Sequence, residues 1–472
     1  MGAINPISIC LRCSGKVLRT LLHYVPAVLI AASLSGCATR TWNAPLIETD
    51  TAPRYDFKSR LPRDNAQNVF VVLAFSGGGT RAAAFSYGVL KALRDTKITV
   101  DGRSGALLDQ VDVISSVSGG SYTAAYYGLF GSRIFDDFEE KVLKRDVEAG
   151  MLSELLDPLN DGSLMRPNYN RGDLAAKWLD DNVFDHKTFS DMSLDQRPFV
   201  IINASDINNA LTFSFIQQQF DFLCSNLNSY PVANAVMASS AVPAIFAPIA
   251  VRNYDSDCTE RRNSWVPYEL AADESYTREH QVARALDRYF YPKRMPVVRL
   301  LDGGITDNLG VRGSMMSPVA HYGNVEDMAG AFTPQALDRV TKVLVIVANA
   351  QVYNEFDWSR DGTDPSIPEM LVSSFDASVD ILSTETVSLA KNGFQMWADR
   401  INARRKPGLP RVTVDFATLT FDDIKDPGER GRFNSIPTAL SLPGKDVDDL
   451  EALAATLVQQ SPDIQRFVKS LH

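Results

Sequence analysis

Three glycine-rich turns contain the residues of this sequence that could perform chemistry. They read Ser76-Gly77-Gly78-Gly79-Thr80-Arg81, Ser116-Val117-Ser118-Gly119-Gly120 and Asp302-Gly303-Gly304. A serine held between small residues where a strand turns into a helix is a potential nucleophile, because bulky neighbours would clash in so tight a turn. Ser118 is therefore the predicted nucleophile, although Ser116 stands where the usual Gly-x-Ser-x-Gly elbow has its first glycine.

The first turn predicts an oxyanion hole. Three successive glycines before a helix leave backbone N–H groups free to meet negative charge. The sequence lacks the Gly-Lys-[Ser/Thr] of a phosphate loop, and Ala82 breaks the Gly-x-Gly-x-x-Gly pattern of dinucleotide sites. We therefore expect the N–H groups of Gly77, Gly78 and Gly79 to stabilise the charge that develops on an ester carbonyl oxygen.

Asp302 and Arg81 are the charged candidates. Asp302 directly follows the strand-like run 295–301 and precedes two glycines, so its carboxylate is the expected partner of Ser118. Arg81 lies just past the glycine loop, where it could bind the phosphate or carboxylate of a substrate or could be a surface residue at the start of a helix. A cation at a helix N-terminus opposes the helix dipole, so Arg81 needs a compensating partner.

Buried strands are predicted before each of these turns. The apolar runs 68–75 and 107–113 precede the first two turns, and helical patterns over 82–94 and 122–130 follow them. The carboxyl ends of parallel strands are where open α/β sheets place their sites. Further strands are predicted at 197–203, 211–216, 343–348 and 411–421, and further helices within 131–195, 232–241, 368–405 and 447–471.

Composition and charge fit a globular protein that does not bind nucleic acid. Apolar residues make up 45% of the 472 residues, which is enough for a large core. The formal net charge is −10, and residues 1–36 carry three basic residues and no acid, so the remainder carries −10 − 3 = −13. A surface that acidic argues against nucleic acid as a partner.

The N-terminus is predicted to be a lipoprotein signal peptide over residues 1–36. A basic region and a short apolar run, 21–33, lead into Leu34-Ser35-Gly36-Cys37, which resembles the lipobox of bacterial lipoproteins. Cys37 would then be lipidated, and Ala38 after it favours sorting to the outer membrane, with the protein facing the periplasm of a bacterial envelope. A plain transmembrane anchor or an uncleaved signal is the alternative, but the run is short for a span of about 20 residues.

Two of the five cysteines remain for the folded domain. Cys10 and Cys13 lie in the signal and Cys37 is the lipidation site, which leaves Cys224 and Cys258. An even number of cysteines in an oxidising compartment predicts a disulfide between them. Two independent buried thiols are the alternative.

Taken together, the three turns resemble those of the patatin-like phospholipase family. The block from Ala238 to Pro248, between the elbow and Asp302, also resembles a family motif. The resemblance covers roughly residues 68–350 and implies a Ser–Asp dyad on an α/β fold. In that fold a central mixed, mostly parallel sheet is sandwiched between helices, with a helical cap. Expected boundaries are a tether over 37–64, a catalytic domain over 65–350 and an α+β extension over 351–472 packed on that domain.

The predicted function is a serine acyl hydrolase, a phospholipase or lipid esterase. The sequence predicts no cofactor and no metal-ligating residues, and it leaves open whether Ca²⁺ matters. Its predicted partners are a membrane lipid as substrate and the membrane itself through Cys37; the sequence leaves its oligomeric state open. One alternative is an inactive envelope scaffold that keeps the fold. Another is a carboxylesterase or thioesterase with a triad, since Ser118, Asp302 and His321 follow the Ser, Asp, His order of α/β-hydrolases.

Overall fold

A computed structural model describes most of the chain after residue 67 and two short stretches before it. The described residues are 41–47, 53–56, 68–156, 169–192, 198–243, 245–254, 258, 265–273, 275–314, 339–353, 358 and 362–471. The predicted signal peptide, Cys37 and His321 lie outside these ranges.

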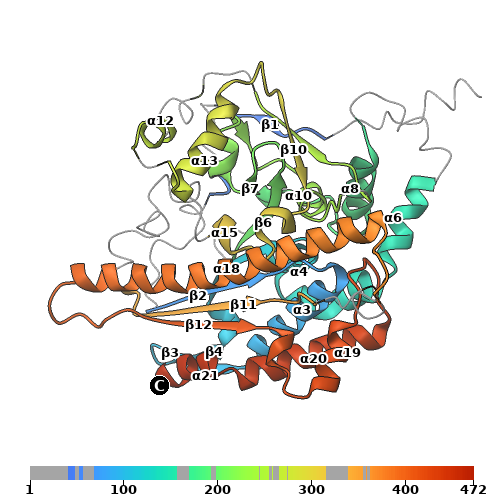
Figure 1. The fold of residues 1–472 in the computed structure, drawn as a ribbon. Coiled ribbons are helices and arrows are strands. Elements are labelled where there is room, and N and C mark those ends of the chain that lie inside the picture. The colour runs from blue at the N-terminus through green and yellow to red at the C-terminus, as the bar shows by residue number, and fades with distance from the viewer. Residues whose placement is uncertain are drawn as a thin grey trace, which may run out of the picture.

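A single eight-stranded sheet forms the centre of the molecule (Figure 1). Its strand order is β12-β11-β2-β5-β6-β10-β9, with β7 paired to β6. The first five strands of this order run parallel, whereas β7, β10 and β9 pair antiparallel. The strands are β2 (Val69–Phe75), β5 (Val111–Val117), β6 (Phe199–Asp206), β7 (Leu211–Ser214), β9 (Ile249–Arg252), β10 (Val297–Leu301), β11 (Lys342–Ala348) and β12 (Thr413–Leu419).

Helices cover both faces of this sheet, which confirms the predicted mixed, mostly parallel sheet between helices. In Figure 1, α18 runs along one side of β2, β11 and β12, and α20 and α21 lie on the other side. The main helices are α3 (Gly79–Asp95), α4 (Gly119–Phe130), α5 (Ile134–Phe138), α6 (Val147–Leu156), α8 (Arg171–Asn182), α9 (Gln217–Asp221), α10 (Val232–Ser239), α12 (Val266–Leu270), α13 (Arg278–Asp287), α14 (Gly304–Asp307), α15 (Val311–Ser314), α18 (Ile367–Arg404), α19 (Pro427–Asn434), α20 (Gly444–Gln460) and α21 (Pro462–Ser470).

The central strands are buried along their whole length because both of their faces are covered. Every residue of β2 and of β5 is buried, as is usual for parallel strands packed between two helical layers. β5 begins at Val111, later than predicted, because 107–110 forms a 3₁₀ turn. Among the described residues, no helix combines the length and the apolar character that a membrane span requires.

The chain before β2 is not a free tether where it is described. β1 (Ala44–Pro45) pairs with β8 (Ser225–Asn226), and Tyr55 is buried. The Tyr55 hydroxyl donates to the carbonyl oxygen of Val200 on β6 at 2.8 Å, and its ring stacks on Phe199. The expected tether over 37–64 therefore does not hold for these two stretches, because their side chains find partners on the domain.

Candidate active site

Ser118 lies at the corner between β5 and α4 with a strained backbone. Its φ of 49° is in the left-handed region that favours glycine. A Cβ at residue 119 would collide with the carbonyl oxygen of Gly79, so only glycine lets the elbow approach the glycine loop. Ser116 is accommodated because its hydroxyl donates to the carbonyl oxygen of Ile201 at 3.1 Å.

Asp302 meets the Ser118 hydroxyl from the end of β10. Ser118 Oγ donates to Asp302 Oδ2 at 2.8 Å, and the N–H of Gly304 donates to Oδ1 at 2.8 Å. Ser118 is 6% exposed and Asp302 is 7% exposed. Burial raises the pKa of Asp302 from 3.8 to about 6, while its two hydrogen bonds oppose that rise. The carboxylate can therefore accept a proton from Ser118 and still be ionised at neutral pH.

The C-terminal end of α10 connects the two turns, which is a role the sequence analysis did not assign to the Ala238–Pro248 block. Ser239 Oγ accepts the N–H of Ser118 at 2.8 Å and donates to the carbonyl oxygen of Asn203 at 2.6 Å. The carbonyl oxygens of Ser239 and Ala241 accept the N–H groups of Gly303 and Asp302, both at 3.0 Å. The serine at position 239 of this sequence motif, the last residue of α10, was the available signal.

The glycine loop lies beside the nucleophile, but not all of its N–H groups are free. A Cβ at residue 77 would lie 3.3 Å from Cβ of Ser118. The N–H of Gly77, however, donates to the carbonyl oxygen of Asn308 at 2.9 Å. The predicted oxyanion role of Gly77 is therefore not supported, because its N–H group already has a partner.

Gly78, Gly79 and Gly119 are the remaining candidates for oxyanion donors. Within the described ranges, none of their N–H groups has a hydrogen-bond partner. Gly119 was missed at the sequence level, although the residue after the nucleophile commonly donates to the oxyanion in serine hydrolases. The three N–H groups come from the N-termini of α3 and α4, where the helix dipole also favours negative charge.

Arg81 does not face a substrate. It is 2% exposed, and its guanidinium donates to the carbonyl oxygens of Ala350 and Ile436 at 2.8 and 2.5 Å and to Oγ1 of Thr438 at 2.9 Å. The predicted substrate contact is thus wrong for this conformation, and so is the alternative of a surface residue. The compensating partners that a cation at a helix N-terminus needs come from far along the chain. They are two backbone oxygens, the hydroxyl of Thr438 and the charge of Asp376.

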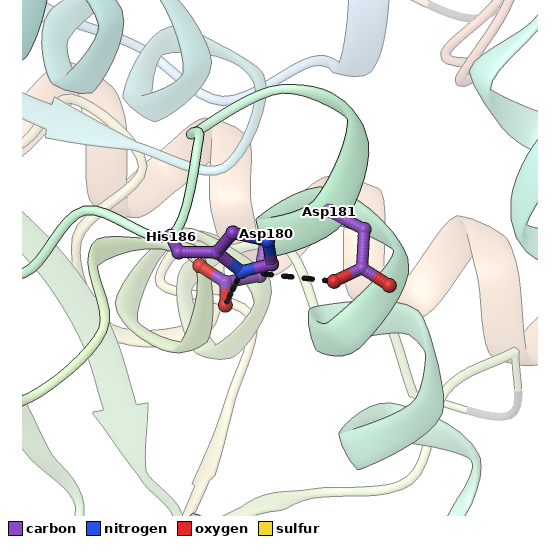
Figure 2. A group of neighbouring side chains, drawn as sticks. All are labelled: Asp180, Asp181 and His186. Atoms are coloured by element: carbon purple, nitrogen blue, oxygen red, sulfur yellow. Dashed lines mark hydrogen bonds and ion pairs between the residues drawn. The ribbon is translucent and has the colours of Figure 1, made fainter.

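The described histidines lie away from the dyad. His186 Nδ1 is 3.0 Å from Oδ2 of Asp180 and 3.7 Å from Oδ1 of Asp181. Figure 2 shows the two carboxylates beside the imidazole. The Asp180 carboxylate raises the pKa of His186. His280 Nδ1 contacts the carbonyl oxygen of Glu269 at 3.2 Å. In the part of the chain that the structure describes, neither imidazole contacts Ser118 or Asp302.

The group of Asp180, Asp181 and His186 also has the ligand types of a metal site. Its geometry is that of an ion pair at the surface, with the His186 side chain 68% exposed. A second group joins Glu139, Asp448 and Glu451, where Lys91 already binds Glu451 at 2.8 Å. Neither group therefore requires an ion to account for its contacts.

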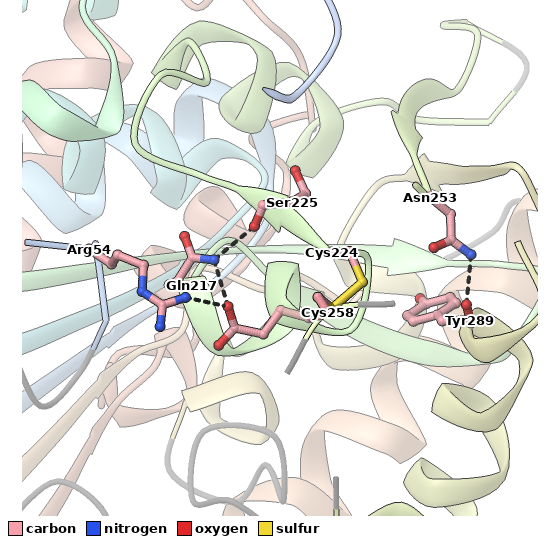
Figure 3. Close-up of a disulfide and its surroundings, with 8 residues drawn as sticks. Arg54, Gln217, Cys224, Ser225, Asn253, Cys258 and Tyr289 are labelled. Atoms are coloured by element: carbon pink, nitrogen blue, oxygen red, sulfur yellow. Dashed lines mark hydrogen bonds and ion pairs between the residues drawn. A yellow bond between two sulfur atoms is a disulfide. The ribbon is translucent and has the colours of Figure 1, made fainter. Parts of the chain in front are cut away.

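Cys224 and Cys258 are joined in a disulfide with a sequence separation of 34 residues (Figure 3). The bond lies beside α9, where Asp221 accepts from Gln217 at 2.8 Å and pairs with Arg54 at 3.0 Å. The disulfide therefore closes a loop at the place where the stretch 53–56 joins the domain.

Comparison with known proteins gives one family. A family model described as patatin-like phospholipase matches residues 73–314, more than half of the chain. This range runs from β2 to the end of α15 and contains the glycine loop, Ser118 and Asp302. No curated protein matches the chain.

Solved structures resemble the chain at low identity. Human GIVD cytosolic phospholipase A2 in complex with methyl gamma-linolenyl fluorophosphonate and terbium chloride is 14% identical, with 86% of this chain and 59% of that chain covered and a TM-score of 0.39. VipD from Legionella pneumophila is 11% identical, with 90% of this chain and 72% of that chain covered and a TM-score of 0.28. The chain spans only 59% to 62% of the length of the human phospholipase chains.

Proposed function

Because this chain belongs to the patatin-like phospholipase family, we propose that it is a serine hydrolase that cleaves the ester bonds of lipids with Ser118 and Asp302. The observation that carries the proposal is the 2.8 Å hydrogen bond from Ser118 Oγ to Asp302 Oδ2. A nucleophile within hydrogen-bond reach of its base is the geometric requirement for covalent catalysis.

In the first half of the reaction, Asp302 takes the proton of Ser118 as Oγ attacks the ester carbonyl carbon. The negative charge moves to the carbonyl oxygen, where the N–H groups of Gly78, Gly79 and Gly119 would receive it. Loss of one such donor typically costs about 100-fold or more in kcat. The tetrahedral intermediate then expels the alcohol, which takes the proton from Asp302, and leaves an acyl group on Ser118.

Water completes the cycle. Asp302 accepts a proton from the water molecule as it attacks the acyl-enzyme, and the second tetrahedral intermediate collapses to release the fatty acid. Asp302 then returns the proton to Ser118 Oγ. A base with a pKa of about 6 suits both halves of the reaction, because it is ionised at neutral pH and remains basic enough to take a proton.

Hydrolysis by wild type, Ser118→Ala and Asp302→Ala tests this proposal, with a short p-nitrophenyl ester and a phospholipid as substrates. We expect both variants to fold, as judged by circular dichroism, and to lose activity toward both substrates. Activity toward the short ester alone would favour the general esterase or thioesterase alternative. A wild type that hydrolyses no ester, or variants that match it, would favour the inactive scaffold.

We also propose that the protein is anchored in the outer membrane of a bacterial envelope through lipidated Cys37. The disulfide between Cys224 and Cys258 supports a compartment outside the cytoplasm, because disulfides persist where the environment is oxidising. Labelling of cells with a fatty acid should mark the wild-type protein and not Cys37→Ala. Equal labelling of the two proteins would exclude this anchor.

A further inference from the structure

The segment Ile436–Ala439, between α19 and α20, lies against the N-terminus of α3. The carbonyl oxygen of Ala439 accepts the N–H of Thr80 at 2.8 Å. A Cβ at residue 79 would collide with the same oxygen, so the segment and the glycine loop are in direct contact.

Gly79 is held between this segment and the nucleophile elbow. On one side, a Cβ at residue 79 would collide with the carbonyl oxygen of Ala439. On the other side, a Cβ at residue 119 would collide with the carbonyl oxygen of Gly79. Gly119 directly follows Ser118. A displacement of Ala439 would therefore change the position of Gly79 relative to the elbow, and with it two of the candidate oxyanion donors.

Arg81 ties the segment to the loop. Its Nη1 and Nη2 bind Ile436 O and Thr438 Oγ1, while Nε binds Ala350 O, just after β11. A Cβ at residue 78 would lie 3.2 Å from Nη2 of Arg81, so the guanidinium packs against the glycine loop. A planar group with donors on three nitrogens can join three separate acceptors in this way, whereas a lysine ammonium presents its donors from one point.

The segment leads into α20, which packs against α3. A Cβ at Gly88 of α3 would lie 2.7 Å from Cα of Glu451 on α20, so the two backbones cross closely. Lys91 of α3 binds Glu451 at 2.8 Å. Residue 350 and the whole stretch 436–460 lie outside the range that the family model matches.

We propose that Arg81 and Thr438 are positioning residues, through which the segment Ile436–Ala439 holds the glycine loop in the form that leaves the N–H groups of Gly78 and Gly79 free for the oxyanion. The C-terminal part of the chain thereby contributes to transition-state stabilisation without contacting substrate. This inference rests on the proposed function for its catalytic consequence, and its structural half can be tested separately.

Steady-state kinetics of Arg81→Lys and Thr438→Val, with a neutral p-nitrophenyl ester and phosphatidylglycerol in micelles, test the catalytic half. Arg81→Lys keeps the positive charge but loses the guanidinium that bonds three separate acceptors. We therefore expect kcat to fall about tenfold or more on both substrates, with KM nearly unchanged. Thr438→Val removes one hydrogen bond and should lower kcat by about two- to fivefold. Because the two residues act through one link, the double variant should lose little more than Arg81→Lys.

Thr456→Val is the matched control. Thr456 is an exposed threonine on α20 whose hydroxyl donates only within its own helix, to Ala452 O at 3.0 Å. Its kcat should equal that of wild type. A rise in KM for phosphatidylglycerol alone in Arg81→Lys would instead mean that Arg81 binds the lipid phosphate, and an unchanged kcat on both substrates would also overturn the inference.

Hydrogen–deuterium exchange of the full chain tests the structural half even if no ester is hydrolysed. We expect Arg81→Lys to speed exchange both in peptides that contain Gly79 and Thr80 and in peptides that contain Ile436–Ala439, while Thr456→Val leaves both unchanged. Unaltered exchange around Gly79 in Arg81→Lys would show that the segment does not hold the loop. Failure of the proposed function is distinct, because it appears as an inactive wild type.

Discussion

The hydroxyl of Ser239 accepts the backbone N–H of Ser118, the proposed nucleophile, at 2.8 Å. It also donates to Asn203 O and lies 3.0 Å from Oγ of Ser121, so its one donor and two acceptor positions are all used. Because the carbonyl oxygen of the same residue accepts the N–H of Gly303, Ser239 is bonded to both catalytic turns.

Ser239→Ala should therefore weaken both folding and catalysis. The change leaves the N–H of Ser118 buried without a partner, which costs about 1–3 kcal/mol, and it loosens the elbow. We expect kcat to fall at least about tenfold, which corresponds to about 1.4 kcal/mol in the barrier, with little change in KM. Ser240→Ala is the control, since that buried hydroxyl, on the residue after α10, donates to Val236 O of the helix at 2.8 Å. Equal kcat values for the two variants would rule out this role.

Replacement of Ser118 by glycine should give a more stable protein than replacement by alanine. Both variants lack the nucleophile and should be inactive, but only glycine adopts a φ of 49° without strain. The difference in free energy of unfolding should be about 1 kcal/mol in favour of glycine, measured by urea denaturation. At Ser121, inside α4, the order should reverse, because glycine is less stable than alanine in a helix by about 1 kcal/mol.

The activity should depend on the ionisation of Asp302. The carboxylate must be deprotonated to accept the Ser118 proton, so kcat/KM should rise with pH and level off above the pKa of about 6. A pH profile from 4.5 to 8.5 with a neutral ester measures this. A rate that stays constant down to pH 4.5 would contradict the assignment of Asp302 as the base.

Asp302→Asn should be inactive and more stable than wild type at neutral pH. The pKa of Asp302 is higher in the folded chain, about 6, than its ordinary 3.8. The contribution of Asp302 protonation to the free energy of unfolding is therefore fully present below pH 3.8 and is lost as pH rises through 6. This difference in pKa corresponds to about 3 kcal/mol at most, so the gain should appear at pH 7 and vanish near pH 4. A gain in stability that is the same at pH 4 and at pH 7 would contradict this prediction.

Reduction of the disulfide should destabilise the domain. Closing a loop with a sequence separation of 34 residues stabilises the folded chain by about 4 kcal/mol in the chain-entropy account. Dithiothreitol should lower the melting temperature of wild type. It should leave that of Cys224→Ser/Cys258→Ser unchanged, at the lower value of the reduced protein. No response of wild type would mean that the bond is absent in solution.

The sequence predicted those parts of the fold and the site that depend on the types of residue present. Buried strands such as β2 are visible as apolar runs, and the turns that carry Ser118 and Asp302 have compositions that few other structures require. The hairpin of β3 (Lys97–Val100) and β4 (Arg103–Ala106) was missed. Its Asp101-Gly102 turn is nevertheless a strong hairpin signal.

The two site assignments that the structure does not support, Gly77 and Arg81, involve partners that are mostly backbone atoms. Gly77 bonds Asn308 O, and Arg81 bonds Ala350 O and Ile436 O. Every residue except proline has the same N–H group and every residue has the same carbonyl, so such contacts leave no pattern in the sequence. They depend on how distant segments come together in the fold, which residue types alone do not determine.

The contact between Gly79 and Ala439 also bears on when, during synthesis of the chain, the glycine loop gains its support. A chain that emerges from its N-terminus presents Ser118 and Asp302 long before Ala439 has been synthesised. Until Ala439 and α20 have been synthesised, α3 lacks its neighbouring helix and the glycine loop lacks its support. A chain that ends before Ala439 would thus contain both Ser118 and Asp302 without the contact that positions Gly79, so the proposed activity would arise only after the C-terminal helices have formed.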